Sequence, residues 1–384
     1  MYKNSLINNI ISENNNELLI KGEHFEKFLS KEKGATLIVI KDIISDNCLF
    51  LNDVIKKATK NSFTVCYAYK VAPTMEILEV IKERGMGIEI YSLTELEMAL
   101  SIGVSTIVVD GMYKTDELLT KSIQNNVTII NADSIKEIIR INEIAEKYNI
   151  IQDIGIRVKK REDSKMGISV EQIEQFLTTL KSFHNVRVIG VHIHPGSNAS
   201  EEVVINSYLK MFNMFKVLRN AGFLIKYVDF GGGLPERNIV EKSLLKRISE
   251  YIDAFEKHED IHYIFEPGRF IVGDAGIIFS RVLDKRVDEN LIILNIAVMP
   301  YFSNTKSTFR YMFPSQIKYE PKGSWRICGL WPLDQDEISS EALYQGVPKE
   351  LEEGDCFCIL NAGAYNIDRI EEYTLTGDME IKYI

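Results

Sequence analysis

The chain lacks several features that would assign it to other protein classes. It has no run of about 18 consecutive apolar residues, so we expect no membrane-spanning helix. Its first residues, Met-Tyr-Lys-Asn-Ser, lack the apolar stretch of a secretory signal peptide. Positive charge is also in deficit, because 45 Lys and Arg stand against 55 Asp and Glu. With a net charge of -10 and no basic stripe, nucleic acid is not expected as a main partner.

Cysteine is scarce in this sequence. The five cysteines are odd in number, scattered and mostly inside apolar runs. This pattern predicts reduced thiols and a cytoplasmic protein rather than a disulfide framework. Cys356 and Cys358 alternate as in a strand, and no second Cys or His pair lies nearby. We therefore expect neither a zinc site nor any other metal site.

The remaining composition is that of a globular protein, with 45% hydrophobic and 26% charged residues, and 384 residues suffice for two domains. From about residue 60 to residue 275, short β-rich runs alternate with longer amphipathic stretches. The eight predicted strands are 63–67, 87–91, 106–110, 127–131, 154–159, 187–194, 225–230 and 262–266. Helical spacing marks 74–84, 92–101, 134–148 and 200–221. Ser92 and Ser134 each precede a Glu by three residues, the spacing of a capping box.

Eight β-α units predict an α/β fold, a closed (β/α)₈ TIM barrel. A doubly wound open sheet is the alternative with the same pattern. After Gly276 strand-like runs dominate, which predicts a second, β-rich domain that also includes the first 40 or so residues. The predicted boundaries are 43–275 for the barrel, and 1–42 with 276–384 for the β-rich domain.

Chemically useful residues fall near the carboxyl ends of different predicted strands. They are Lys70, Asp110, Arg157, His194, the triplet Gly231, Gly232 and Gly233, and Glu266. In a barrel these ends form one face, which is where the active site lies. This convergence favours the barrel over the open sheet.

These residue types suit pyridoxal 5′-phosphate (PLP). Lys70 closes an apolar run and is expected to hold the PLP aldehyde as a Schiff base. His194 is expected to stack on the ring, and Glu266 to keep the ring nitrogen protonated. Glycines 231–233 would let backbone N–H groups approach the phosphate, with Arg269 beside them.

Several segments resemble the fold-type III, alanine-racemase-like PLP decarboxylases, which act on diaminopimelate, ornithine, arginine or carboxynorspermidine. The matching segments are Y-A-Y-K (67–70), G-I-E-I-Y-S (87–92) with Glu95, S-K-M-G (164–167), H-P-G-S (194–197), D-F-G-G-G (229–233), E-P-G-R (266–269) and G-A-Y (363–365). The resemblance covers nearly the whole chain. It implies a barrel plus a β-domain, PLP-dependent decarboxylation of an amino acid or an amino-acid conjugate, and a homodimer with two shared active sites.

The resemblance also assigns roles to individual residues. Cofactor contacts are implied for Glu89, Ser197, Gly268, Arg269 and Tyr365. Arg310 resembles the arginine that binds the substrate carboxylate. Arg157 has two interpretations, as a support of the cofactor site or as part of an internal salt bridge. His192 is interpreted as structural.

One motif departs from the family pattern. The segment by which the second subunit completes the site reads G-P-x-C-[ED]-x-x-D in the family, and G-L-W-P-L-D-Q-D here from Gly329. The cysteine position becomes Pro332, while Cys328 lies ahead of the glycine. Asp334 or Asp336 is expected to enter the partner's site and to act there on the substrate. The missing cysteine favours a specialised branch in secondary metabolism, such as siderophore synthesis.

Two other functions remain open at this point. A PLP racemase or epimerase of the same fold would also protonate a carbanion, although its usual tyrosine motif is not evident in this chain. A catalytically inactive PLP-binding protein would be consistent with the lost cysteine, whereas the intact set of cofactor residues argues against it.

Overall fold

The computed structural model describes residues 10–31, 33–258, 260–298, 310–318, 325–338, 347–367 and 379–384. The chain forms two compact units. A barrel unit comprises Cys48–Leu234 and Lys242–Gly268, and a β-rich unit comprises Met1–Asn47, Pro235–Glu241 and Arg269–Ile384. Residues 43–47, 235–241 and 269–275 thus belong to the β-rich unit, whereas the predicted boundaries assigned them to the barrel.

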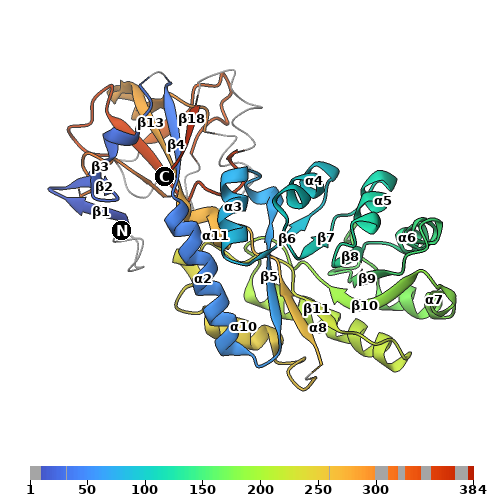
Figure 1. Ribbon diagram of the computed structural model, residues 1–384. Coiled ribbons are helices and arrows are strands. Elements are labelled where there is room, and N and C mark those ends of the chain that lie inside the picture. The colour runs from blue at the N-terminus through green and yellow to red at the C-terminus, as the bar shows by residue number, and fades with distance from the viewer. Residues whose placement is uncertain are drawn as a thin grey trace. The chain divides into compact units, whose positions relative to one another are not determined.

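The barrel unit is a closed ring of eight parallel strands in the order β10-β11-β12-β5-β6-β7-β8-β9. The strands are β5 (Phe63–Ala68), β6 (Gly87–Ile90), β7 (Ile107–Val109), β8 (Ile129–Ala132), β9 (Gln152–Arg157), β10 (Val186–His192), β11 (Tyr227–Asp229) and β12 (His262–Phe265). All eight predicted strands are present, and the predicted (β/α)₈ barrel is confirmed. Figure 1 shows helices α4 to α7 outside the ring of strands.

Apolar side chains from different strands fill the barrel. Cys66, Val108, Ile129, Ile189 and Ile264 form one buried cluster. β-Branched residues dominate these strands because their stiff side chains pack well on a pleated surface. The filled interior leaves chemistry to the side chains at the carboxyl ends of the strands.

The helices of the structure are α2 (Lys41–Ala58), α3 (Met75–Glu83), α4 (Leu93–Ile102), α5 (Asp116–Gln124), α6 (Ile135–Lys147), α7 (Val170–Ser182), α8 (Glu201–Asn220), α9 (Arg237–Val240), α10 (Leu244–Ile252) and α11 (Arg269–Val272). The capping box of Ser92 and Glu95 forms as predicted. At α6 only half of the predicted capping box forms, because Ser134 accepts a hydrogen bond from the N–H of Glu137 but the return bond is missing. The Glu137 carboxylate instead accepts hydrogen bonds from Lys114 and from the N–H of Asp133. None of the described helices is long and apolar enough to cross a membrane.

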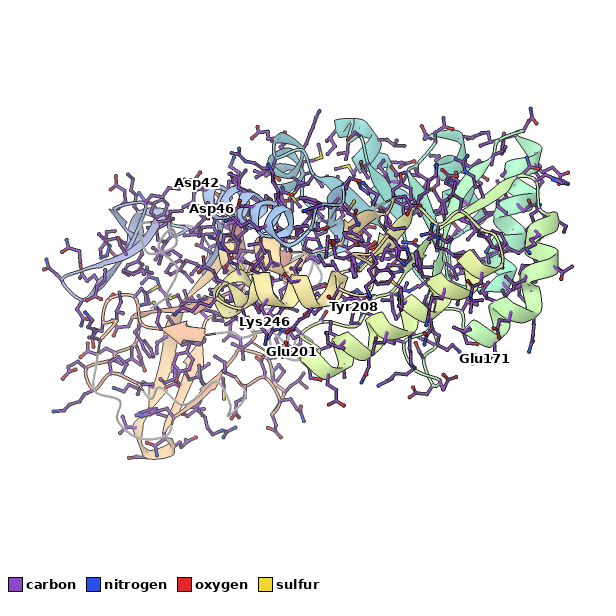
Figure 2. All side chains as sticks on the ribbon, turned by 90° about the horizontal axis from the view of Figure 1, so that it is seen from below. Asp42, Asp46, Glu171, Glu201, Tyr208 and Lys246 are labelled. Carbon is purple, nitrogen blue, oxygen red and sulfur yellow. The ribbon has the colours of Figure 1, made fainter. Side chains whose placement is uncertain are left out.

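Helix α8 packs on the barrel through an aromatic cluster. Tyr208, which Figure 2 labels, donates a hydrogen bond to the carbonyl of Phe230 at 3.1 Å. Its ring lies 5.1 Å from the ring of Phe230 and 4.9 Å from that of Tyr251 in α10. This cluster supports the chain directly before the glycine triplet that begins at Gly231.

The β-rich unit contains a three-stranded antiparallel sheet and a seven-stranded mixed sheet. Its strands are β1 (Ile11–Asn14), β2 (Glu17–Ile20), β3 (Glu23–His24), β4 (Ala35–Val39), β13 (Gly276–Arg286), β14 (Leu291–Leu294), β15 (Arg310–Met312), β16 (Arg326–Cys328), β17 (Cys356–Leu360) and β18 (Met379–Tyr383). Strand β4 pairs antiparallel with β13 and parallel with β18, as Figure 1 shows. An N-terminal strand thus joins a C-terminal sheet, which confirms the predicted β-rich domain.

Candidate active site

Lys70 lies just beyond β5, in the short 3₁₀ turn Tyr69–Val71. Its Nζ donates to both carboxylate oxygens of Glu89, at 2.6 and 2.5 Å. Glu89 comes from the neighbouring strand β6 and is 1% exposed, whereas the Lys70 side chain is 34% exposed. The lysine side chain is therefore partly exposed, while a buried carboxylate compensates the charge of its amine.

The charges of this pair affect each other. Burial raises the pKa of Glu89 to about 7, although Lys70 opposes the shift. Burial would lower the pKa of Lys70, but Glu89, Asp110 and Glu266 together raise it above its ordinary value. An amine attacks an aldehyde only after it has lost its proton, and Glu89 is the adjacent base that can accept one.

His192 brings together the ends of three strands. It is fully buried at the end of β10; its Nδ1 lies 3.6 Å from Oδ1 of Asp110, and its Nε2 lies 3.3 Å from Oε2 of Glu266. Burial would lower the pKa of His192, but these two carboxylates and Asp229 raise it to about 9. Within the described residues the other oxygen of Glu266, Oε1, is buried and has no hydrogen-bond partner.

Arg157 is held by carboxylates on two sides. Its Nη1 lies 3.3 Å from Oδ1 of Asp110, and its Nε lies 3.6 Å from Oδ1 of Asp133. Asp133 also accepts a hydrogen bond from the N–H of Gly167, in the S-K-M-G segment. The structure thus shows the internal salt bridges, and Asp110 links them to His192.

The glycine triplet, Gly231–Gly233, is packed too tightly for any side chain. A Cβ added at the first, second or third position would lie 2.6, 2.4 or 2.5 Å from a backbone carbonyl oxygen. These oxygens belong to Ile193, Glu266 and Gly196. Only glycine permits this approach of the loops that follow β10, β11 and β12.

His194 contacts the same loop. Its Nδ1 accepts a hydrogen bond from the N–H of Gly232 at 3.3 Å, so this nitrogen carries no proton. Burial lowers the pKa of His194 to about 3, and the nearby cations Lys70 and Arg157 add to the shift. The imidazole is therefore neutral, which suits stacking on an aromatic ring. Ser197 lies partly exposed further along this loop.

Gly268 brings the E-P-G-R segment against the lysine turn. A Cβ at this position would lie 2.2 Å from Cγ2 of Val71. The N–H of Ala68 donates to the carbonyl of Pro267 at 3.2 Å. These backbone contacts fix the chain around Lys70 relative to the segment that carries Glu266.

The β-rich unit holds two further predicted cofactor residues close together. Arg269 forms a buried ion pair with Glu236 at 3.2 Å, and its guanidinium carbon lies 5.1 Å from the ring centroid of Tyr365. Tyr365 has a φ of 62°, which is uncommon for a bulky residue. Such backbone strain occurs often at ligand sites. Next to Tyr365 in the chain, the loop is tight, since a Cβ on Gly363 would lie 1.9 Å from the carbonyl oxygen of Val272.

The loop that departs from the family motif is held by Asp336. Its carboxylate is 2% exposed and accepts hydrogen bonds from the N–H groups of Val298 and Trp331, at 2.7 and 2.8 Å. These contacts give Asp336 a structural role within its own chain, in contrast to the predicted contact with a partner's substrate. Asp334 and Pro332 are exposed.

Two other predicted positions lie in the β-rich unit. Arg310 begins β15 and pairs with Leu360, but its side chain lies outside the described residues, so its contact with a substrate carboxylate stays a prediction. Cys328 is partly buried in β16, and burial raises the pKa of its thiol.

The barrel site fits PLP on two structural observations. The buried and unpartnered Oε1 of Glu266 is a ready acceptor for a protonated ring nitrogen. The glycine triplet offers backbone without side chains, as a phosphate requires. Together with a partly exposed lysine paired to a carboxylate, these features are those of a PLP-dependent barrel enzyme.

Comparison with known proteins agrees with this class. The chain belongs to the pyridoxal-dependent decarboxylases: the family model for their pyridoxal-binding domain matches residues 51–273. A diaminopimelate decarboxylase of Aquifex aeolicus is 27% identical over 348 residues, which cover 81% of this chain and 78% of that protein. One from Vibrio cholerae is 25% identical over 332 residues, or 80% and 78% of the two chains.

Solved structures show the same fold. The crystal structure of diaminopimelate decarboxylase from M. jannaschii has a TM-score of 0.83 at 23% identity and covers 98% of this chain and 93% of that one. The Helicobacter pylori enzyme complexed with L-lysine has a TM-score of 0.81 at 23% identity and covers 94% of both chains. The protein is a PLP-dependent amino-acid decarboxylase, and the racemase alternative is not favoured.

Sequence reasoning missed part of the site. His192 was interpreted as structural, yet it joins Asp110 and Glu266. Asp229 and Asp133 were not singled out, although Asp229 accepts from the N–H of Gly231 and Asp133 contacts Arg157. The available signal was position, since His192 ends β10 and Asp229 ends β11.

Proposed function

We propose that the protein decarboxylates an amino acid with a charged group at its far end, through PLP bound at Lys70. The observation that carries this proposal is the barrel cluster in which Lys70 pairs with buried Glu89 while Glu266 keeps one buried oxygen unpartnered. The relatives support the substrate class, because diaminopimelate carries a second amino-acid group at its far end.

Different residues of the site would contact different parts of PLP. PLP, when bound, supplies an electron-withdrawing ring that stabilises the negative charge left on the α-carbon. Lys70 would hold the aldehyde, and Glu89 is the adjacent base for the lysine proton. Glu266 would accept a hydrogen bond from the ring nitrogen, and neutral His194 would pack on the ring. The loop Gly231–Gly233 would lie against the phosphate, where the absence of side chains leaves room for it.

The outer contacts of the cofactor follow from the resemblance. Glu89, Ser197, Gly268, Arg269 and Tyr365 are proposed to complete its binding. The ion pair of Arg269 with Glu236 supports this, because it orients a buried guanidinium, the group best suited to a phosphate.

The proton that replaces the lost carboxylate needs a donor other than a loop cysteine. Pro332 and Leu333 carry no suitable proton, and both are exposed. We assign the donor to water, Lys70 or Asp334. This departure is also why we place the enzyme in a specialised branch of secondary metabolism.

We further propose a cytoplasmic homodimer with shared active sites. Asp334 is the exposed carboxylate of the loop 328–338, so it is the better candidate to reach a partner's substrate than buried Asp336. Mixing Lys70→Ala chains with Asp334→Ala chains tests this. Random exchange makes about half of the dimers mixed, each with one intact site, so about a quarter of full activity should return. No recovery despite demonstrated exchange of subunits would contradict a shared site that needs Asp334.

The substrate test uses the purified protein loaded with PLP. A panel of diaminopimelate, ornithine, arginine and lysine is incubated with the enzyme, and both CO₂ and the configuration of the recovered amino acid are measured. The proposal predicts CO₂ from at least one diamino acid, and none with Lys70→Ala. Inversion without CO₂ would instead show a racemase, and neither product, even with an extended panel of amino-acid conjugates, would show an inactive PLP-binding protein.

A further inference from the structure

His192 lies between two carboxylates that come from other strands. Its ring is fully buried, with Nδ1 3.6 Å from Asp110 and Nε2 3.3 Å from Glu266. Neither contact has hydrogen-bond geometry, so the ring is held by charge and packing. In the barrel register His192 pairs with Arg157 of β9 on one side and with Asp229 of β11 on the other. Ionisable groups therefore face it from every neighbouring strand end.

The charges around His192 favour a further cation. Two cations, Lys70 and Arg157, face five buried carboxylates. The five carboxylates are Glu89, Asp110, Asp133, Asp229 and Glu266. Burial of unbalanced charge is costly, so the cluster takes up protons. Burial, and then the charge of Glu266, raise the pKa of Asp229 well above its usual range. A protonated His192 adds a third cation, directly between Asp110 and Glu266.

We propose that His192 is a positioning residue for Glu266: the imidazolium lies between Asp110 and Glu266 and engages Oε2 of Glu266, which leaves Oε1 for the ring nitrogen of PLP. This inference rests on the proposed role of Glu266. The imidazolium contacts Glu266 directly, so it stabilises charge on that carboxylate more than it opposes charge on a group beyond it. The proton shared by Glu266 and the ring nitrogen is thereby directed to the nitrogen.

A metal ion bound by Asp110, His192 and Glu266 is the alternative to a proton on His192. Asp110, His192 and Glu266 each offer one ligand atom, and these atoms lie within 4.8 Å of one another. However, the guanidinium of Arg157 lies 3.3 Å from the same oxygen of Asp110 that faces His192. A metal cation there would face a guanidinium at close range. A proton on His192 satisfies the two carboxylates without this repulsion.

The test measures the protonation state of the PLP ring nitrogen directly. The protein is loaded with PLP that carries an NMR-active isotope at this nitrogen, and its chemical shift is recorded in wild type and in His192→Gln, below the His192 pKa of about 9. We expect a protonated nitrogen in wild type and a shift toward the neutral position in His192→Gln. The matched control is His262→Gln, at the opposite end of the barrel, which should match wild type because His262 contacts Ser62 and Thr64 instead.

The outcomes separate this inference from the proposed function. An unchanged, protonated nitrogen in His192→Gln overturns the role of His192 and leaves that of Glu266 intact. A neutral nitrogen already in wild type overturns the role of Glu266. If His192→Gln does not fold or retain PLP, neutron diffraction of the wild-type holoenzyme decides. Deuterium on both ring nitrogens of His192 supports the inference, and deuterium on only one contradicts it.

Discussion

The Nζ of Lys70 donates to both oxygens of the Glu89 carboxylate, at 2.6 and 2.5 Å, and Glu89 is almost fully buried. A carboxylate so close favours the protonated amine, which cannot attack an aldehyde. Glu89 therefore keeps Lys70 protonated, and it is also the base to which the lysine proton can pass. The pH at which PLP is taken up should depend on Glu89.

Replacement of Glu89 by glutamine tests this dependence. The amide no longer raises the pKa of Lys70, so PLP should be incorporated at lower pH. At a given pH below the lysine pKa the rate should rise about tenfold or more, the effect expected for loss of an opposite charge at hydrogen-bond distance. The measurement is the rate at which visible absorption appears after the apoprotein is mixed with PLP. Glu97→Gln removes an exposed carboxylate and should leave the rate unchanged.

Gly232→Ala should weaken PLP binding. Its Cβ would lie 2.4 Å from the carbonyl oxygen of Glu266, and relief of such overpacking costs about 1–3 kcal/mol and moves the loop. The dissociation constant of PLP reports the change. Gly85→Ala is the control, because its Cβ meets open space and only its φ of 67° is strained. Equal affinities for both variants would show that the triplet does not shape the cofactor site.

The buried imidazolium should give the protein a defined pH dependence. The pKa of His192 is raised from 6.5 to about 9, so its contribution to stability is fully present below pH 6.5 and is lost as pH rises through 9. The melting temperature of wild type should therefore fall over this window relative to that of His192→Gln, which cannot titrate at this position. Parallel curves for the two proteins would show that His192 is neutral throughout.

Cys328→Ala should retain most of the activity. A general acid typically contributes about 10²–10⁴-fold, so loss of a true proton donor would be obvious. Cys328 lies in β16, and its backbone forms an isolated antiparallel β-bridge with that of Glu337. In the chain it precedes Gly329 instead of following it. The turnover of the variant is compared with that of wild type at equal PLP content. Loss of turnover with fold and PLP binding intact would mean that the cysteine has been displaced in the loop rather than lost.

The sequence predicted the barrel well because its signals are local. Strand runs rich in β-branched residues and helix caps such as Ser92 act within a few residues. The half-formed cap at Ser134 shows the limit of this approach. The Glu137 side chain is used by Lys114, a buried lysine 23 residues away in the chain that no local pattern connects to it.

The site was harder to predict because its contacts are between strands. A lone histidine such as His192 carries no motif, and its contact with Glu266 depends on the closure and register of the barrel. Asp336 shows a second limit of motif reasoning. A motif position suggested contact with a substrate, whereas its carboxylate binds backbone N–H groups that become neighbours only in the folded loop.

The most direct test of the whole account is the site of covalent attachment of PLP. The purified holoenzyme is reduced with borohydride, digested, and the modified peptide is identified by mass spectrometry. The account predicts that the reduced cofactor is found on Lys70, and that Lys70→Ala gives no adduct. An adduct on another lysine of the wild-type protein, or no adduct in a protein that has bound PLP, would contradict it.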